Sequence, residues 1–337
     1  MRKAVMRLLW GLLLAALLAA AGVAWWLQRP LPLATGLTVA ELAIEPGTSP
    51  KAVAQAAVDA GLSTSPQALA LWFRWSGQDR QIRAGSYEIP AGTSPRRLLA
   101  MLVRGEESLR SLTVVEGWNW RQLRQALARA EQLRNDSAAL SDAQLMARLG
   151  RPGQAPEGRF YPDTYSYAKG SSDLQLLARA LKAMDRQLAQ AWAARSPGVA
   201  LQNPDQALIL ASIVEKETGK GSDRAMISSV FHNRLRLGML LQTDPTVIYG
   251  LGEAFDGNLR RIHLRTDTPW NTYTRAGLPP TPIAMPGKAA LLAAVQPADS
   301  QALYFVARGD GSSQFSLTLD EHNRAVNRYQ RAGKGPD

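Results

Sequence analysis

Two glutamates separated by one residue, Glu215 and Glu217, have the setting that best suits acid–base chemistry in this chain. They end the segment Ala207–Thr218, whose apolar residues recur at the spacing of a helix. At about 100° per residue, Glu217 lies on the same stripe as Ile213 and Val214, whereas Glu215 lies roughly opposite, on a more polar side. Apolar neighbours raise the pKa of a carboxyl and keep it protonated near neutral pH, as a general acid must be. The pattern therefore favours Glu217 over Glu215.

On helix position alone, a solvent-facing residue of the last turn is the more common case, so the assignment depends on the loops that follow. Amide, hydroxyl and aromatic side chains recur there, and this mixture binds sugar hydroxyls, acetamides and pyranose faces. Each loop alone also fits turn chemistry, and Asp244 before Pro245 could simply cap a helix. Together the loops predict a sugar-binding groove. Its candidate substrate-binding residues are Gln242, Asp244, Tyr249, Asn271, Tyr273 and, from an earlier loop, Glu157.

Several segments, in order along the chain, resemble those of the endolytic murein transglycosylases, the YceG-like family. They are Glu157–Tyr165 (EGRFYPDTY), Ala211–Thr218 (ASIVEKET), Gln242–Val247 (QTDPTV), Asn271–Tyr273 (NTY) and Gly277–Pro280 (GLPP). The resemblance covers essentially the whole chain. Two residues differ from the family pattern. Thr281 replaces the glycine that is common after GLPP, and Met285 stands where a small polar residue is common before Pro-Gly. Both departures concern the geometry of that loop and not the class of reaction.

The resemblance implies cleavage of the MurNAc–GlcNAc bond of nascent peptidoglycan, which leaves a 1,6-anhydroMurNAc end and terminates elongation of the glycan strand. It implies that the catalytic acid is the second glutamate of EKET, Glu217, and it suggests work beside peptidoglycan synthases. One acid suffices, because the C6 hydroxyl of the substrate can be the nucleophile, whereas most glycosidases need two carboxylates.

Two alternatives remain open. One is a muramidase, a hydrolase in which Glu157 or Asp244 supplies a second carboxylate. The other is a non-catalytic, membrane-anchored scaffold that binds glycan. For Glu157, a purely structural role in its loop is a further alternative to contact with substrate.

The composition narrows the classes of function. The 337 residues include no cysteine, which excludes disulfides and thiolate nucleophiles, and the histidines His232, His263 and His322 are far apart. We therefore expect no metal and no cofactor. The formal net charge of +11 suits an anionic polymer or a membrane surface, although an Arg-rich solvated surface explains it equally well. Because no zinc-finger, P-loop or RNP-like pattern accompanies the charge, nucleic acid is not an expected partner.

The first thirty residues predict a membrane anchor. Leu8–Leu27 carries no charge and is long enough to cross a bilayer as a helix. The basic residues Arg2, Lys3 and Arg7 before it predict that the N-terminus stays in the cytoplasm. We therefore expect a single-pass protein of the cytoplasmic (inner) membrane with its catalytic domain in the periplasm. A cleavable signal peptide is the alternative, because Ala19–Ala24 offers small residues.

The remaining pattern predicts an α+β fold. Between Leu37 and Glu107 it reads strand, helix, helix, strand, helix, and the turn at 46–50 is echoed at 91–95. This unit resembles a LysM-like glycan-binding module, although a spacer without binding activity fits as well. A mostly helical catalytic domain with β-hairpins lining a groove should follow. The predicted regions are a cytoplasmic tail (1–7), a transmembrane anchor (8–27), a LysM-like subdomain (37–110), a connecting α/β segment (111–155) and the catalytic domain (156–331).

The anchor can be tested without reference to activity. We predict that the full-length protein fractionates with membranes and that a C-terminal reporter active only outside the cytoplasm gives signal, because the charge-free run follows three basic residues. Cell fractionation and the reporter assay measure these two outcomes. Recovery of a soluble form that begins near Ala24 or Trp25 would contradict the anchor and favour a signal peptide.

Overall fold

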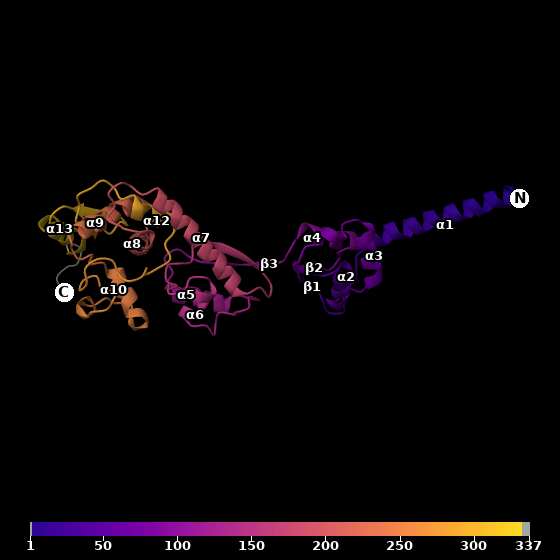
Figure 1. Ribbon diagram of the computed structural model, residues 1–337, viewed down its shortest axis with the longest axis horizontal. Helices are drawn as coiled ribbons and strands as arrows, with labels where there is room; N and C mark the ends of the chain where they lie inside the picture. The colour runs from indigo at the N-terminus through magenta and orange to yellow at the C-terminus, as the bar shows by residue number, and fades with distance from the viewer. Residues whose placement is uncertain (1, 332–337) are drawn as a thin grey trace. The chain divides into compact units, whose positions relative to one another are not determined.

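The computed structural model of the protein describes residues 2–331, which form a mixed arrangement of helices and strands (Figure 1). Helices account for 49% of the chain, so the predicted mixture of helix and strand is confirmed. The chain divides into two compact units. The first comprises Met1–Arg110 and Ser166–Gly170, and the second comprises Ser111–Tyr165 and Ser171–Asp337.

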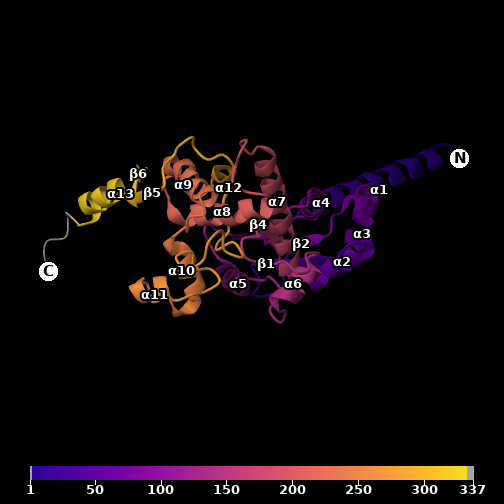
Figure 2. The same ribbon diagram turned by 60° about the vertical axis from the view of Figure 1, so that its left-hand side comes forward.

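Helix α1 (Arg2–Gln28) is the one helix of the described chain that is long and apolar enough to cross a membrane. Its candidate span Leu9–Gln28 has a mean hydropathy of 1.9 and none of it is buried. The end of α1 is fixed to the first unit: Trp26 packs on the core of that unit, and the Leu31 N–H donates to the Thr93 carbonyl over 2.9 Å. Figures 1 and 2 both show α1 leaving the unit near α3 (Pro66–Trp75), and α1 contacts α4 (Pro95–Arg104).

The first unit is a two-stranded sheet covered by three helices. Strand β1 (Val39–Ile44) pairs antiparallel with β2 (Gly85–Pro90), and every second side chain of β1 is buried. Helices α2 (Pro50–Asp59), α3 and α4 (Pro95–Arg104) each begin with a serine N-cap followed by proline. The order β1, α2, α3, β2, α4 is the predicted one, with a short 3₁₀ turn, η1 (Asp79–Gln81), added.

Strands β3 (Leu109–Thr113) and β4 (Thr164–Ala168) pair with each other and carry the chain between the units. The second unit is mostly helical. Its elements are α5 (Trp120–Arg129), α6 (Asp142–Arg148), α7 (Asp173–Ala193), α8 (Pro204–Glu217), η2 (Gly221–Asp223), α9 (Arg224–Arg236), α10 (Asp244–Leu251), η3 (Gly252–Ala254), α11 (Arg261–Arg265), α12 (Lys288–Val295), β5 (Tyr304–Ala307), β6 (Ser313–Ser316), α13 (Leu319–Val326) and the π-helical turn Asn327–Arg331.

Helix α8 is the centre of the second unit. It contacts α7, α9, α10 and α12, and its residues from Ala207 to Val214 are buried except Ile209. A helix that is apolar on all sides is stable only when other elements surround it. Since α8 ends at Glu217, its last turn is where the buried helix meets the loops of the candidate site.

The sequence predicts a strand pair at 303–306 and 315–319 joined by the turn 308–311, and this hairpin is confirmed as the antiparallel pair β5–β6, with β6 beginning at Ser313. Its turn closes through the Arg308 N–H and the Ser312 carbonyl, 2.8 Å apart. The side chains of Phe305 and Phe315 pack against the core of the second unit, and Phe305 meets Phe231 edge-on at 5.9 Å. The hairpin therefore belongs to the packing around α8.

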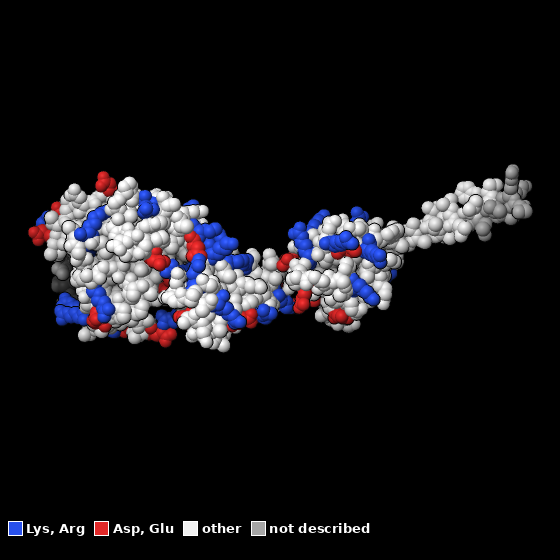
Figure 3. Space-filling view, viewed as in Figure 1, with Lys and Arg blue, Asp and Glu red and all other residues white. Residues whose placement is uncertain are grey.

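Charged side chains are dispersed over the face shown in Figure 3. Lys and Arg gather in several small groups, with Asp and Glu beside many of them. A continuous basic stripe, the usual footprint of a nucleic-acid site, is not seen on this face.

Candidate active site

The carboxyl of Glu217 lies at the end of α8 and is held by Thr243, whose hydroxyl donates a hydrogen bond to it. Burial raises the pKa of Glu217 from 4.5 to about 7. The hydrogen bond from Thr243 lowers this pKa, the negative charge of Asp244 raises it, and the positive charge of Arg234 lowers it. A carboxyl with this pKa can both give and take a proton at neutral pH.

Asp244 and Tyr273 are brought together beside Glu217. The Tyr273 hydroxyl donates to the exposed Asp244 carboxylate over 2.6 Å, and burial together with the charges of Asp244 and Glu217 raises the pKa of Tyr273. Three of the predicted site residues, Glu217, Asp244 and Tyr273, therefore act on one another.

Arg234 and Thr243 also act on Glu217, although neither was predicted as a site residue. Arg234 is buried on α9, where it donates to the carbonyls of Leu303 at 2.7 Å and Leu241 at 2.9 Å. An arginine beside the apolar residues Val230, Phe231 and Leu235 of this helix was the available signal, since a buried cation needs partners. Thr243 stands between two predicted residues, and only the fold reveals that its hydroxyl faces α8.

The loop that presents Thr243 is fixed by a second threonine. The Thr243 N–H donates to the Thr272 hydroxyl over 3.1 Å, and the hydroxyls of Thr272 and Thr246 are 2.9 Å apart. Gln242, just before, has a φ of +47°, a left-handed conformation that is uncommon outside glycine, and its side chain is exposed. Backbone strain of this kind persists where surrounding contacts determine the conformation.

Asn271 is fully buried and all its side-chain groups have partners within the protein. Its amide nitrogen lies 2.7 Å from the Thr266 carbonyl and 3.2 Å from those of His263 and Leu264, and its oxygen accepts from the Tyr273 N–H over 2.9 Å. The side chain therefore closes the loop after α11 and positions Tyr273.

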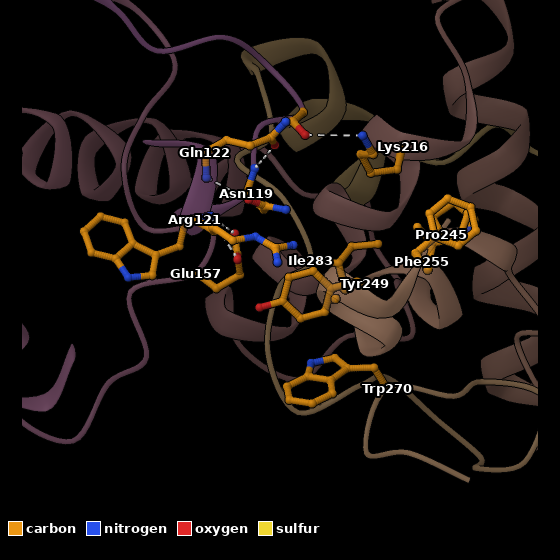
Figure 4. Close-up of a pocket in the computed structure, with 14 residues that line it drawn as sticks. Asn119, Arg121, Gln122, Glu157, Lys216, Pro245, Tyr249, Phe255, Trp270 and Ile283 are labelled. Atoms are coloured by element: carbon orange, nitrogen blue, oxygen red, sulfur yellow. Dashed lines mark hydrogen bonds between the residues drawn. The ribbon is translucent and has the colours of Figure 1, made fainter. Parts of the chain in front are cut away.

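A cavity of about 620 Å³ adjoins this cluster (Figure 4). Its walls come from the start of α5, the last turn of α8, α10 and Trp270. Glu157 and Tyr249 line it, whereas Glu217, Gln242, Asp244, Asn271 and Tyr273 do not. No residue of β5–β6 lines it either, so this hollow differs from the expected groove with β-hairpin walls.

Glu157 forms the buried end of this cavity. Its two carboxylate oxygens accept from the Trp120 N–H at 3.0 and 3.1 Å, and further bonds come from the Gly158 N–H and the Tyr249 hydroxyl. Burial raises the pKa of Glu157 to about 7 against these bonds. Gly158 has a φ of +73°, and a Cβ there would lie 2.4 Å from Pro282, so glycine is required next to this acid.

The side chain of Glu215 is only 7% exposed, so burial does not separate it from Glu217. Because α8 is surrounded, both acids point into the protein. Burial raises the pKa of Glu215, the Gly287 N–H donates to its carboxylate over 3.0 Å, and Arg224 lies 3.9 Å away. Glu215 therefore does have polar partners, as predicted. Its carboxylate holds the loop before α12 and does not face the loop that carries Thr243.

Among residues 2–331 we find no group of three or more His, Asp or Glu side chains that could hold a metal ion.

Comparison with known proteins identifies the family of this chain. Residues 42–328 match the family model described as the YceG-like family. The chain belongs to the YceG-like family. A crystal structure of a YceG-like protein from Listeria monocytogenes is similar, with a TM-score of 0.55 and 28% identity over 85% of this chain and 98% of that one.

Two curated relatives carry the name endolytic murein transglycosylase. The Bacillus subtilis protein is 29% identical over 316 residues, which is 87% of this chain and 85% of the relative. The Streptococcus pneumoniae protein is 28% identical over 283 residues, 73% of this chain, and the match spans only half of that relative's length.

The burial of Glu217 should appear as pH-dependent stability. Below pH 4.5 its carboxyl is protonated in the folded and unfolded states, so Glu217→Gln should change the melting temperature little. As the pH rises toward 7, the unfolded chain loses this proton while the folded protein retains it, so the free energy of unfolding of the unmodified protein falls. At pH 8 the variant should be more stable by about 1–3 kcal/mol.

Thermal unfolding of both proteins at pH 4 and pH 8 measures this difference. An equal change in melting temperature at the two pH values would mean that Glu217 is not buried as described.

Proposed function

We propose that this protein is an endolytic murein transglycosylase. It cleaves MurNAc–GlcNAc bonds of nascent peptidoglycan, leaves 1,6-anhydroMurNAc ends and so terminates elongation of the glycan strand. The supporting observation is the half-buried Glu217 side chain, whose carboxyl has a pKa of about 7 and is held by Thr243. It occurs in a chain of the YceG-like family whose curated relatives are named for this activity.

Glu217 acts first as acid and then as base. Its protonated carboxyl gives a proton to the glycosidic oxygen as the bond from that oxygen to C1 of MurNAc breaks. The resulting carboxylate takes the proton of the C6 hydroxyl as that oxygen bonds to C1, which returns Glu217 to its starting state. No water is consumed, and no second carboxylate is needed as nucleophile.

The neighbours of Glu217 balance its two states. The negative charge of Asp244 favours the protonated acid before cleavage, whereas the Thr243 hydroxyl and the Arg234 charge stabilise the carboxylate afterwards. Asp244, held by Tyr273, also provides a negative charge for the positive charge that develops at C1.

The other predicted residues take separate roles. Gln242, exposed beside Thr243, contacts sugar, and the ring of Tyr249 contacts the part of the substrate that enters the adjoining cavity. Asn271 positions Tyr273 and does not touch substrate, since its own groups are engaged. Glu157 orients Tyr249 and the start of α5.

A muramidase is the second candidate, and its best second carboxylate is Asp244. The charge of Asp244 acts on Glu217, whereas Glu157 accepts hydrogen bonds from the backbone N–H groups of Trp120 and Gly158. A glycan-binding scaffold without activity is disfavoured because the curated relatives are named for transglycosylase activity.

The remaining regions place the enzyme at its substrate. Helix α1, with its candidate span Leu9–Gln28, anchors the protein in the cytoplasmic membrane with its N-terminus inside, so the catalytic domain (156–331) works in the periplasm. The LysM-like subdomain (37–110) binds or orients the strand, and the segment 111–155 connects the two. Peptidoglycan synthases are the expected neighbours, because they make the nascent strands.

The two glutamates of α8 provide the test. Glu217→Gln keeps size and hydrogen bonding but removes the transferable proton, so the cleavage rate of purified sacculi should fall by about 10²–10⁴-fold. Glu215→Gln removes one charge from the same turn and keeps an oxygen for the Gly287 N–H, so it should lose far less.

Product release is measured by chromatography, with melting temperature and glycan binding as checks on folding. Equal activity of the two variants, or greater damage at Glu215, would contradict the assignment.

A further inference from the structure

We propose that the 620 Å³ cavity lined by Glu157 and Tyr249 binds the acidic stem peptide that MurNAc carries, and so makes the enzyme prefer strands that retain their peptides. This inference rests on the proposed function, because it assigns the part of the same substrate that lies beside the cleaved bond. The cavity is called the stem pocket below.

The stem pocket begins one residue away from the reacting groups on two elements. Lys216, which lines it, precedes Glu217 on α8, and Pro245, which also lines it, follows Asp244 on α10. In this proposal, a sugar whose glycosidic bond lies at Glu217 has its other substituents beside this pocket. The lactyl group at C3 of MurNAc, to which the peptide is joined, is such a substituent.

Two cationic side chains face the pocket. Figure 4 shows Arg121 extending from α5 into the pocket toward Tyr249, and Lys216 reaching from α8 to the Gly117 carbonyl at 3.3 Å. Within the described chain, Lys216 has no carboxylate within the 4 Å of an ion pair. Arg121 pairs only with Glu253, whose side chain is 84% exposed, and such a surface pair contributes little. Both cations can therefore take a carboxylate from a ligand.

The acid in the pocket does not cancel them. The hydrogen bonds of Glu157 come from Trp120, Gly158 and Tyr249, and Trp120 is the first residue of α5, whose N-terminus carries partial positive charge. The carboxylate of Glu157 is thus stabilised by groups of the protein and does not need Arg121 or Lys216 as a partner. Arg121 and Lys216 are left as the charged groups available to a ligand.

The opposite wall is aromatic and rigid. Tyr249 and Trp270 meet edge-on at 5.4 Å, and the Trp270 indole N–H donates to Thr281 over 2.9 Å. Ile248 and Phe255 extend this wall. An apolar wall opposite two cations suits a short peptide with small apolar residues and carboxylates, whereas a bare sugar offers the cations hydroxyl groups but no opposite charge.

The test compares strands that carry stem peptides with the same strands after their peptides have been removed, using the full-length protein in detergent. The unmodified protein should cleave the peptide-bearing strands with the higher kcat/KM. Arg121→Gln should reduce this preference by about tenfold or more, the range for a hydrogen bond between charged groups. Lys216→Gln should act in the same direction, and Arg121→Lys should restore part of the preference.

Arg129→Gln is the matched control, because Arg129 is an exposed arginine at the far end of α5 and does not line the pocket. It should leave the preference unchanged. Raising the salt concentration should weaken the preference of the unmodified protein, because salt screens charge pairs near the surface.

Equal cleavage of both substrates by the unmodified protein would overturn the stem pocket and leave the proposed function standing. An equal loss on both substrates in Arg121→Gln and Lys216→Gln would also overturn it, since the residues would then bind glycan or maintain the fold. Cleavage of neither substrate by the unmodified protein would overturn the proposed function itself.

Discussion

The hydrogen bond from the Thr243 hydroxyl to Glu217 is the contact on which the site depends. Burial of α8 takes its final carboxyl out of water and raises its pKa to about 7, and such a group needs a donor to exist in its ionised form. The bond supplies that donor without locking the carboxyl in one charge state. Because the donor is Thr243, the conformation of the loop before α10 must be fixed as firmly as that of a core element.

That loop is held by neighbours with little freedom of their own. Thr272 bonds the Thr243 N–H, Asn271 uses its whole amide within the loop after α11, and Gln242 adopts a left-handed conformation. Proteins tolerate strain of this kind where contacts over-determine it, and commonly near functional groups. Glu157 is a second acid whose pKa is raised to about 7. Its hydrogen bonds position Tyr249 and the start of α5, and it does not transfer a proton to the substrate.

Local patterns in the sequence predict local structure well here. The alternation of β1, the serine–proline starts of three helices and the glycine-containing turn of β5–β6 are all short-range signals, and these elements form as predicted. Such patterns do not predict which side chains from distant parts of the sequence meet. The stripe on α8 predicted a more polar side for Glu215, yet that side chain is as enclosed as a core residue, because α8 is surrounded. Glu157 meets Trp120 from 37 residues away, and no periodicity reveals such a contact.

The central claim is that Glu217 alone transfers the proton while the substrate supplies its own nucleophile. Cleavage of purified glycan strands in water enriched in ¹⁸O, followed by mass spectrometry of the products, tests it most directly. The account predicts 1,6-anhydroMurNAc ends without ¹⁸O, because no water enters the reaction. Reducing ends that carry ¹⁸O would contradict it, since they require attack by water and a second carboxylate such as Asp244 to activate it.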